Sequence, residues 1–255
     1  MHLLIDIGNS TIVVAKAEAD GSIGHTWRFK TQKDETLSFF RNELQIGINR
    51  WSTSSTDIES VIVSSVVPEI NDKISQAIHD VIGLMPKFFS IEDAQKVINI
   101  DIESPSQLGK DRIADAIGAA TLYGTPCIVI DMGTATTIGI VTADNTFTGG
   151  MIIPGVKTSL KALSSRASQL PCINIEKPKN MIGRNTMECM QSGILYGTAA
   201  MIDGIIDRIL PTLSPDAKIV ATGGMSKQII PYCSHNITID EYLQFKGIFR
   251  SFLIG

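Results

Sequence analysis

The amino-acid sequence predicts an α/β fold made of two similar lobes, and three observations lead to this prediction. A strand–turn–strand pattern at Leu3–Ala17 occurs again at Ile128–Thr142. In each half, hairpin strands come first, and strands that alternate with helices follow them. The repeat distance is close to half of the 255 residues, a length sufficient for one large domain or two small ones. Together these observations indicate two copies of one module that face each other across a cleft.

The two copies correspond most clearly at an acidic turn. In each copy an aspartate ends a buried strand, a glycine follows two positions later, and hydroxyl or amide residues come next. The spacing between the copies is 125 positions at each of these points. It pairs Asp6 with Asp131, Gly8 with Gly133, Thr11 with Thr136, and the turn Ala19-Asp20 with Asp144-Asn145.

The first turn joins two strands and does not lead into a helix. His2–Ile7 is mostly apolar, and Thr11–Ala15 is β-branched and too apolar on consecutive positions for an amphipathic helix. Rossmann and Walker loops have the order strand, glycines, helix. In this chain, a phosphate would therefore meet the backbone N–H groups of a hairpin turn.

The rest of the first half alternates between strands and helices, and Asp20-Gly21 is a second hairpin signal. The expected elements are a strand at His25–Lys30, a helix that begins within Asp34–Arg41, a strand at Ser60–Val67, a helix at Pro68–Ile82, a short strand at Lys87–Ser90, an irregular stretch at Ile98–Ser106 and a helix at Leu108–Tyr123.

The second half repeats this order, so we place one lobe at residues 1–123 and the other at 124–255. Ala217–Thr222 is the expected counterpart of Val61–Ser65. This order predicts the duplicated ribonuclease-H-like architecture, the arrangement of actin, sugar kinases and the large heat-shock chaperones. The expected elements are strands at Cys127–Asp131, Thr136–Thr142 and around Phe147–Ile153, helices at Val156–Gln169 and Met187–Leu210, the strand Ala217–Thr222 and a helix at Tyr242–Phe252.

Composition narrows the functional class. The chain is 44% hydrophobic and 19% charged, which is ordinary for a soluble globular protein. A net charge of −4 and a pI of about 5.6 give no electrostatic support for nucleic-acid binding. No apolar run reaches the ~18 residues of a membrane span, and no signal peptide is recognisable. Scattered cysteines without a CxxC pair fit a reduced, cytoplasmic protein. Because the histidines lack ligand-like spacing, we expect no transition-metal site.

Asp6 and Asp131 are the first candidates for chemistry. A carboxylate at the end of a buried strand, beside a glycine, can hold a cation or a metal-bound water near phosphates. Glycine permits close approach of the backbone to phosphate oxygens, and hydroxyls add donors. The alternative reading of a single Asp-x-Gly is a capped tight turn. The repetition in both halves favours the phosphate-binding interpretation.

Asp111, in Gly109-Lys110-Asp111-Arg112, is the candidate base. It begins a helix, follows a glycine, has cations on both sides and lies near the junction of the halves. An ionised carboxylate there can accept the proton of a substrate hydroxyl that attacks a γ-phosphate. The competing interpretation is a helix N-terminal charge in a local ion pair.

Two loops have two readings each. Arg184-Asn185-Thr186 is either a substrate-facing loop or only a helix cap. Gly223-Gly224 either lets adenine or ribose lie against the backbone or only makes a turn. The small residues of the 187–210 helix permit close helix packing, and a homodimer interface is one use for them.

The motifs together resemble the type III pantothenate kinase family, over essentially the whole chain. Each motif is short, but their order and spacing are specific. The motifs that carry the resemblance are Asp6-Ile7-Gly8-Asn9-Ser10, Leu108–Arg112, Ile130–Thr136, Ile153-Pro154-Gly155, Ala162-Leu163 through Leu170-Pro171, Gly183–Thr186 and Ala221–Gly224.

The resemblance implies an ATP-dependent phosphorylation of pantothenate, the first step of coenzyme A biosynthesis, by a cytoplasmic homodimer. ATP would come with Mg²⁺, and a monovalent cation, K⁺ or NH₄⁺, would bind with the help of Asp131. Asp111 would be the catalytic base, and Thr186 would reach pantothenate across the dimer interface. The ATP contacts implied are Asp6, Ile7, Gly8, Asn9, Ser10, Thr11, Ile12, Val13 and Thr134, and the pantothenate contacts are Gly109, Lys110, Asp111, Arg112 and Thr186.

The segment before Gly109 departs from the family pattern. The family often has an aromatic residue and an Asn-Pro or Asp-Pro pair there, whereas this chain has Ile102-Glu103-Ser104-Pro105. The lining of that part of the pantothenate pocket is therefore not predicted. Two alternative functions remain open at this point: a kinase of the same fold for another small alcohol, and a non-catalytic ATP-binding regulator.

Overall fold

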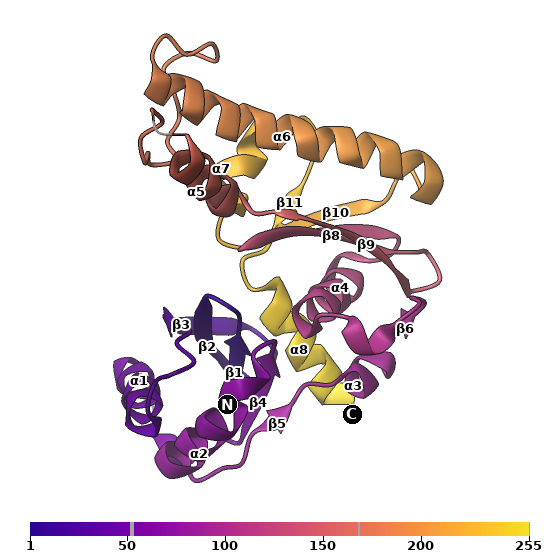
Figure 1. Cartoon of the computed structure of the whole chain (residues 1–255). Helices are drawn as coiled ribbons and strands as arrows, with labels where there is room; N and C mark the ends of the chain where they lie inside the picture. The colour runs from indigo at the N-terminus through magenta and orange to yellow at the C-terminus, as the bar shows by residue number, and fades with distance from the viewer. Residues whose placement is uncertain (52–53, 168, 255) are drawn as a thin grey trace. The chain divides into compact units, whose positions relative to one another are not determined.

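The computed structural model of the chain describes residues 1–51, 54–167 and 169–254, and it divides into two compact units (Figure 1). Unit 1 contains Met1–Thr121 together with the C-terminal residues from Tyr242 onward. Unit 2 contains Leu122–Glu241. The second lobe expected at 124–255 included the final helix, whereas that helix is grouped here with unit 1. No helix in the described part of the chain is long and apolar enough to cross a membrane.

Unit 1 is built on a mixed sheet in the order β3-β2-β1-β4-β5. The hairpin pairs β1–β2 and β2–β3 are antiparallel, whereas β4 pairs parallel with β1 and β5. The central strands are rich in Val and Ile, which favour strands that are buried on both faces. The strands are β1 (His2–Ile7), β2 (Thr11–Ala17), β3 (Ile23–Lys30), β4 (Ser60–Ser65) and β5 (Lys87–Phe88).

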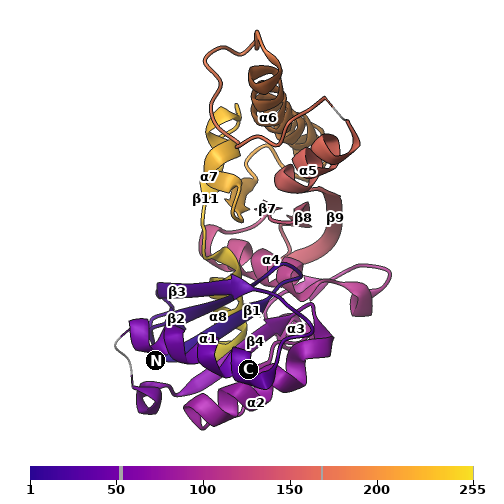
Figure 2. The ribbon, with the colours of Figure 1, turned by 60° about the vertical axis from the view of Figure 1, so that its left-hand side comes forward.

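Helices cover both faces of this sheet (Figure 2). Leu3, Ile5 and Ile7 of β1 belong to the core cluster that also contains buried residues of α1 and α2. Leu4 is also fully buried, and alternation places it on the opposite face, where α8 contacts β1 and β4. The remaining elements of unit 1 are α1 (Leu37–Arg50), α2 (Asn71–Ile82), α3 (Ile91–Gln95), the short strand β6 (Asn99–Ile100), α4 (Lys110–Tyr123, which ends at the start of unit 2) and α8 (Leu243–Ile254).

Glycines permit unusually close packing of α4 against α8. A Cβ added to Gly247 of α8 would overlap the carbonyl oxygen of Ala114 in α4. A Cβ added to Gly118 of α4 would collide with the backbone of Leu243. The two helices therefore meet backbone to backbone, and α8 completes the core of unit 1 although it is the last element of the chain.

The unit 2 strands of the second sheet repeat this topology, in the order β9-β8-β7-β10-β11. Again β7–β8 and β8–β9 are antiparallel, while β10 pairs parallel with β7 and β11. The helices pack on the sheet through a cluster that joins residues of β7 to α6 and α7 (Figure 1). The elements are β7 (Cys127–Met132), β8 (Ala135–Val141), β9 (Thr146–Pro154), α5 (Val156–Arg166), α6 (Thr186–Leu213), β10 (Lys218–Thr222), α7 (Ser226–Ile229) and β11 (Thr238–Ile239).

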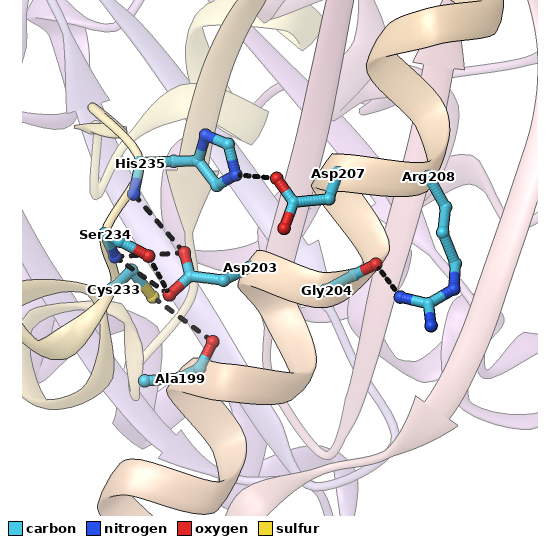
Figure 3. A network of polar contacts seen from close by, with 8 residues as sticks. All are labelled: Ala199, Asp203, Gly204, Asp207, Arg208, Cys233, Ser234 and His235. Carbon is cyan, nitrogen blue, oxygen red and sulfur yellow. Dashed lines mark hydrogen bonds and ion pairs between the residues drawn. The ribbon is translucent and has the colours of Figure 1, made fainter.

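A polar network ties α6 to the segment before β11 (Figure 3). The Asp203 carboxylate accepts hydrogen bonds from the backbone N–H of Ser234, from its hydroxyl at 2.7 Å and from the backbone N–H of His235. One turn further along α6, Asp207 lies 2.9 Å from Nε2 of His235. This network fixes the chain that leads from α7 into β11.

The two sheets confirm the predicted duplication, but the second hairpin turn is one residue shorter. In unit 1 Ile7 pairs with Ile12, whereas in unit 2 Met132 pairs with Thr136. From the second strand onward the repeat distance is therefore 124 positions, and Ala135 rather than Thr136 corresponds to Thr11. The identical burial patterns of β2 and β8 agree with this register.

The turn that follows the second strand of each unit also has the spacing of 124 positions. Asn145 has φ 60° and Gly21 has φ 84°, so the two left-handed positions lie 124 residues apart. In unit 1, Asp20 accepts from Ser22, and in unit 2, Asp144 accepts from Thr146 in the same way. Asp20 thus corresponds to Asp144, and the expected pairing of Ala19-Asp20 with Asp144-Asn145 was wrong by one residue.

Candidate functional site

The first turn is a tight hairpin fixed from the neighbouring strand. The Gly8 N–H donates to the carbonyl oxygen of Thr11 at 3.1 Å. Thr31, just after β3, donates its hydroxyl to the Gly8 carbonyl at 2.6 Å and its N–H to the Ser10 carbonyl at 3.1 Å. Asn9 and Ser10 are exposed at the tip. The turn therefore presents polar groups on a backbone that is held in place.

The predicted stretch from Asp6 to Val13 includes both core and surface positions. The side chains of Ile7 and Ile12 are fully buried in the unit 1 core. Ile7 and Ile12 could therefore contact a ligand only through their backbone N–H and carbonyl groups. The half-buried Asp6 carboxylate accepts a hydrogen bond of 2.7 Å from the side-chain amide of Gln244 in α8. Gln244 was not identified from the sequence, because nothing in its local pattern shows which strand α8 will contact.

The second turn is joined directly to α5. The Gly133 N–H donates to the Ala135 carbonyl at 3.0 Å. The carbonyl of Thr134 accepts from the Gly155 N–H at 3.2 Å and from the Thr158 hydroxyl at 2.7 Å. A Cβ on Gly155 would overlap the carbonyl oxygens of this turn, so the position requires glycine. Thr134 itself remains exposed.

Glycine backbone surrounds the Asp131 carboxylate. Gly223, at φ 85°, lies so close that an added Cβ would overlap Asp131 Oδ1 and the backbone of Met132. A Cβ on Gly133 would lie 3.5 Å from Asp131 Oδ2. This region is a carboxylate packed against glycine backbone, and carboxylate oxygens are ligands that hard cations prefer. Among the described residues, no group of three or more His, Cys, Asp or Glu side chains forms a transition-metal site.

Thr136, which the sequence assigned to the polar part of the second turn, is a core residue. Its side chain is 1% exposed, and its hydroxyl has no hydrogen-bond partner among the described residues. The shorter turn is the physical reason, because it moves Thr136 to the inward-facing strand position that Ile12 occupies in unit 1. Its hydroxyl is therefore not available as a phosphate donor.

Asp111 lies in the first turn of α4. Its Oδ1 accepts the backbone N–H of Arg112 at 2.8 Å. A Cβ on Gly109 would overlap the same oxygen, so glycine leaves the space that the carboxylate fills. Burial lowers the pKa of the Arg112 guanidinium from its ordinary value, and the neighbouring Asp111 charge opposes that shift. Asp111 and Arg112 are half-buried, so the segment combines a carboxylate and a cation at one helix terminus.

Thr186 is the first residue of α6, and the preceding Asn185 is the N-cap of this helix. The Asn185 side chain accepts from the Glu188 N–H at 2.9 Å, and Glu188 in return accepts from the Arg184 N–H at 3.1 Å. Thr186 is exposed beyond this cap. The helix-cap reading of the loop is thus confirmed, while a contact of Thr186 with substrate stays a prediction.

Each unit thus brings together some of the site residues that the sequence predicted. In unit 1, the turn that follows Asp6 is oriented by Thr31 and Gln244. In unit 2, Asp131 and Thr134 are oriented by Gly155, Thr158 and Gly223. The sequence singled out the glycines at 155 and 223 as motif residues, but the supporting hydroxyls of Thr31 and Thr158 carried no signal.

A family model described as type III pantothenate kinase matches residues 2–208. A type III pantothenate kinase of Halalkalibacterium halodurans is 35% identical over 248 residues, which are 97% of each chain.

Solved structures support the same fold. The crystal structure of a conserved putative Baf family transcriptional activator from Campylobacter jejuni is similar with a TM-score of 0.57 and 20% identity, covering 98% of this chain and 97% of that one. A ROK family glucokinase from Streptomyces griseus, solved with glucose and AMPPNP, has a TM-score of 0.51 and 13% identity, covering 97% of both chains. The likeness to a sugar kinase confirms the predicted fold class.

Proposed function

The chain belongs to the type III pantothenate kinase family, and we propose how its residues carry out the reaction of that family. Membership makes it a pantothenate kinase, an ATP-dependent phosphotransferase that acts on an alcohol group in coenzyme A biosynthesis. The observation that carries this conclusion is the 35% identity to a type III pantothenate kinase across 97% of the chain. Residue roles, oligomeric state and cellular location are proposals.

The two hairpin turns bind the phosphates of ATP in this proposal. The first contributes residues 6–13, with backbone N–H groups and the polar side chains at its tip, and the second contributes Thr134. Support comes from the hydrogen bonds that fix both turns, because a preorganised donor loses little freedom when the ligand binds. Mg²⁺ enters with ATP and is held mainly by phosphate oxygens and water, as is usual for this ion.

Asp131 helps to bind a monovalent cation, K⁺ or NH₄⁺. The residues fit such an ion, because the carboxylate is flanked by glycine backbone at Gly133 and Gly223. When bound, the cation supplies positive charge beside the phosphates. We assign it no further step.

Asp111 accepts the proton of the primary hydroxyl of pantothenate. As the proton moves to its carboxylate, the hydroxyl oxygen attacks the γ-phosphorus, the bond to the β,γ-bridging oxygen breaks, and ADP leaves. Gly109, Lys110 and Arg112 contact pantothenate beside the base. The Arg112 guanidinium, partly desolvated, is suited to the carboxylate of pantothenate, because a charge-assisted hydrogen bond strengthens away from water.

We also propose that the enzyme is a cytoplasmic homodimer, and that Thr186 of one protomer contacts the pantothenate held by the other. The exposed apolar side chains near Thr186 support an interface there. They are Met181, Ile182 and Met187, which are 66%, 84% and 54% exposed.

A coupled assay of ADP release tests the function. Pantothenate, ATP and Mg²⁺ are supplied with K⁺ or with Na⁺, and a panel of sugars and other small alcohols replaces pantothenate in parallel. We expect turnover with pantothenate and stimulation by K⁺. Turnover with another alcohol but not with pantothenate would point to a different kinase of this fold, and ATP binding without any turnover would point to a regulator.

A further inference from the structure

A hydroxyl in the core of unit 1 is buried without a hydrogen bond. Ser64 of β4 is 0% exposed, and its Oγ has no hydrogen-bond partner among the residues that the structure describes. On folding, such a hydroxyl gives up its hydrogen bonds to water without replacement, which destabilises the protein. Groups of this kind are rare in native proteins, and a role that depends on a bound ligand is one reason to keep them.

The sheet places this hydroxyl beside a carboxylate of the candidate site. In the parallel pairing of β1 with β4, Asp6 is the register partner of Ser64. Register partners on parallel strands point to the same face of the sheet, and neighbouring strands lie ~4.8 Å apart. Two short side chains at this spacing come within hydrogen-bonding distance of each other through rotamer changes alone.

The face that carries this pair is the one covered by α8. Leu4 and Ile62 lie two positions before Asp6 and Ser64, and both are buried on the same face, where α8 contacts β1 and β4. Gln244 of α8 donates to the Asp6 carboxylate at 2.7 Å. Asp6 is half-buried at the proposed ATP site, whereas Ser64 is fully enclosed. A role of Ser64 toward the nucleotide therefore acts through Asp6.

Unit 2 repeats the pairing of a carboxylate with a buried hydroxyl residue. Asp131 of β7 is the register partner of Thr222 of β10, again on parallel strands, and Thr222 is 4% exposed. The three buried residues before each hydroxyl residue, 61–63 in β4 and 219–221 in β10, are all apolar. Because both copies of the module have a hydroxyl beside the carboxylate and nowhere else in these buried runs, the duplication ties the hydroxyl to the carboxylate.

We propose that Ser64 is a positioning residue for Asp6, an inference that rests on the proposed role of Asp6 in binding ATP. When the nucleotide occupies the first phosphate turn, the Ser64 hydroxyl donates to the Asp6 carboxylate. Together with Gln244 it fixes the orientation of that carboxylate toward the ligand. A carboxylate accepts several hydrogen bonds at once, so it can hold both donors and still face the nucleotide. The hydroxyl gains its partner in the bound state, and this charge-assisted hydrogen bond strengthens nucleotide binding.

Ser64→Ala removes the hydroxyl and is the first test. The dissociation constant for ATP, measured by calorimetry with Mg²⁺ present, and the KM for ATP both rise about tenfold, the lower end of the loss for a hydrogen bond to an ionised group. The KM for pantothenate stays within about twofold of the parent. The midpoint of urea unfolding without nucleotide stays parental or rises, because the unliganded protein loses no hydrogen bond.

Two further variants separate the hydroxyl from its volume and from its neighbour. Ser64→Cys keeps the shape of the side chain but is only a weak donor, so it binds ATP as weakly as Ser64→Ala. Ser65→Ala is the matched control, because the Ser65 hydroxyl donates to Asn71 Oδ1 at 2.7 Å and accepts from the Val67 N–H at 3.1 Å. Loss of these bonds lowers the urea midpoint and leaves the affinity for ATP within about twofold of the parent.

The outcomes separate this inference from the proposed function. Pantothenate turnover by the parent, with parental ATP affinity in Ser64→Ala, overturns the inference and leaves the kinase activity standing. A lower urea midpoint in Ser64→Ala also overturns it, because the hydroxyl then has a partner in the unliganded protein. Recovery of ATP affinity in Ser64→Cys overturns it by showing that volume matters and not the hydroxyl. Weaker ATP binding by Ser64→Ala at parental stability, in a chain that does not phosphorylate pantothenate, supports the inference and removes the proposed reaction.

Discussion

The side-chain amide of Gln244 donates a hydrogen bond of 2.7 Å to Oδ1 of Asp6, across 238 positions of sequence. Through this contact the last helix of the chain orients a carboxylate at the end of the first strand. Since Asp6 leads into the first phosphate turn, Gln244 is a positioning residue for ATP in our proposal.

The first prediction concerns Gln244→Ala. A hydrogen bond to an ionised group contributes about 1.5–3 kcal/mol, and we expect part of this to appear as about five- to tenfold weaker ATP binding. The KM for ATP rises while the KM for pantothenate stays within twofold of the parent, about the precision of such additivity comparisons. The control is Gln45→Ala, which loses a hydrogen bond to Asn49 on the exposed face of α1. An unchanged KM for ATP would show that Asp6 needs no support from α8.

The second prediction concerns Asp111→Asn. Asparagine keeps the shape of the side chain but cannot accept a proton, so kcat falls by about 10²–10⁴, the usual contribution of general base catalysis. Binding of pantothenate, measured by calorimetry, changes little. Asp101→Asn, an exposed carboxylate before the same helix, leaves kcat unchanged. Near-parental turnover of the Asp111 variant would exclude this residue as the base.

The third prediction concerns the cation. If Asp131 holds the cation as proposed, Asp131→Asn removes the charge that binds it, and we expect the K⁺ concentration for half-maximal activity to rise about tenfold or more. The rate is measured as K⁺ replaces Na⁺ at constant ionic strength. Asp144→Asn changes another turn carboxylate of the same sheet and keeps the parental K⁺ response. Equal K⁺ responses of the two variants would place the cation elsewhere.

The fourth prediction concerns the packing of α4 and α8. Gly247→Ala forces a methyl group onto the Ala114 carbonyl, so the free energy of unfolding decreases by about 3 kcal/mol, the upper part of the range for overpacking. Gly197→Ala adds the same methyl group where nothing lies within 4 Å. Because alanine favours helix, the control becomes more stable by up to about 1 kcal/mol. Urea unfolding followed by circular dichroism measures both, and equal stabilities would contradict the close contact.

The fifth prediction concerns alkaline pH. Burial raises the pKa of the Cys127 thiol to about 12 from its ordinary value of 9.0. Above pH 9 the unfolded chain loses this proton while the folded chain keeps it, so the free energy of unfolding falls as pH rises from 9 toward 12. The slope is at most about 1.4 kcal/mol per pH unit for this group.

Two cysteine variants isolate the contribution of Cys127 to this pH dependence. In Cys127→Ala the decline of stability between pH 8 and pH 10.5 becomes shallower, whereas in Cys172→Ala, which changes an exposed thiol, the parental slope remains. Urea titrations at several pH values give the slopes. The same slope in all three proteins would show that Cys127 does not carry the effect.

The order of elements was predictable because hairpin signals and hydrophobic periodicity are local. The register of the second turn was not, because threonine occurs at both 11 and 136 and their identity concealed the missing residue. The pairing of Met132 with Thr136 shows where the strand resumes. Identity between short repeats is thus a weaker guide to register than backbone hydrogen bonds.

The residues of the candidate site also fall into two groups: those that the sequence indicates and those that only the structure reveals. Asp6, Asp111 and Asp131 could be proposed from the sequence because each lies two positions from a glycine at an element boundary. Gln244 and Thr158 were not found, since their importance depends on which distant backbone they reach. Helix α8 was predicted as a helix, but its place in unit 1 depends on contacts of Gly247 that no local pattern contains.

The return of α8 to unit 1 also has a consequence for biosynthesis. As the ribosome synthesises the chain from its N-terminus, β1–β5 emerge before unit 2, but the partner of the Ala114–Gly118 surface of α4 emerges only after unit 2. Unit 1 is consequently begun before unit 2 and completed after it. A nascent chain that stalls before Leu243 leaves this surface uncovered, and a chaperone that recognises apolar segments has until α8 emerges to protect it.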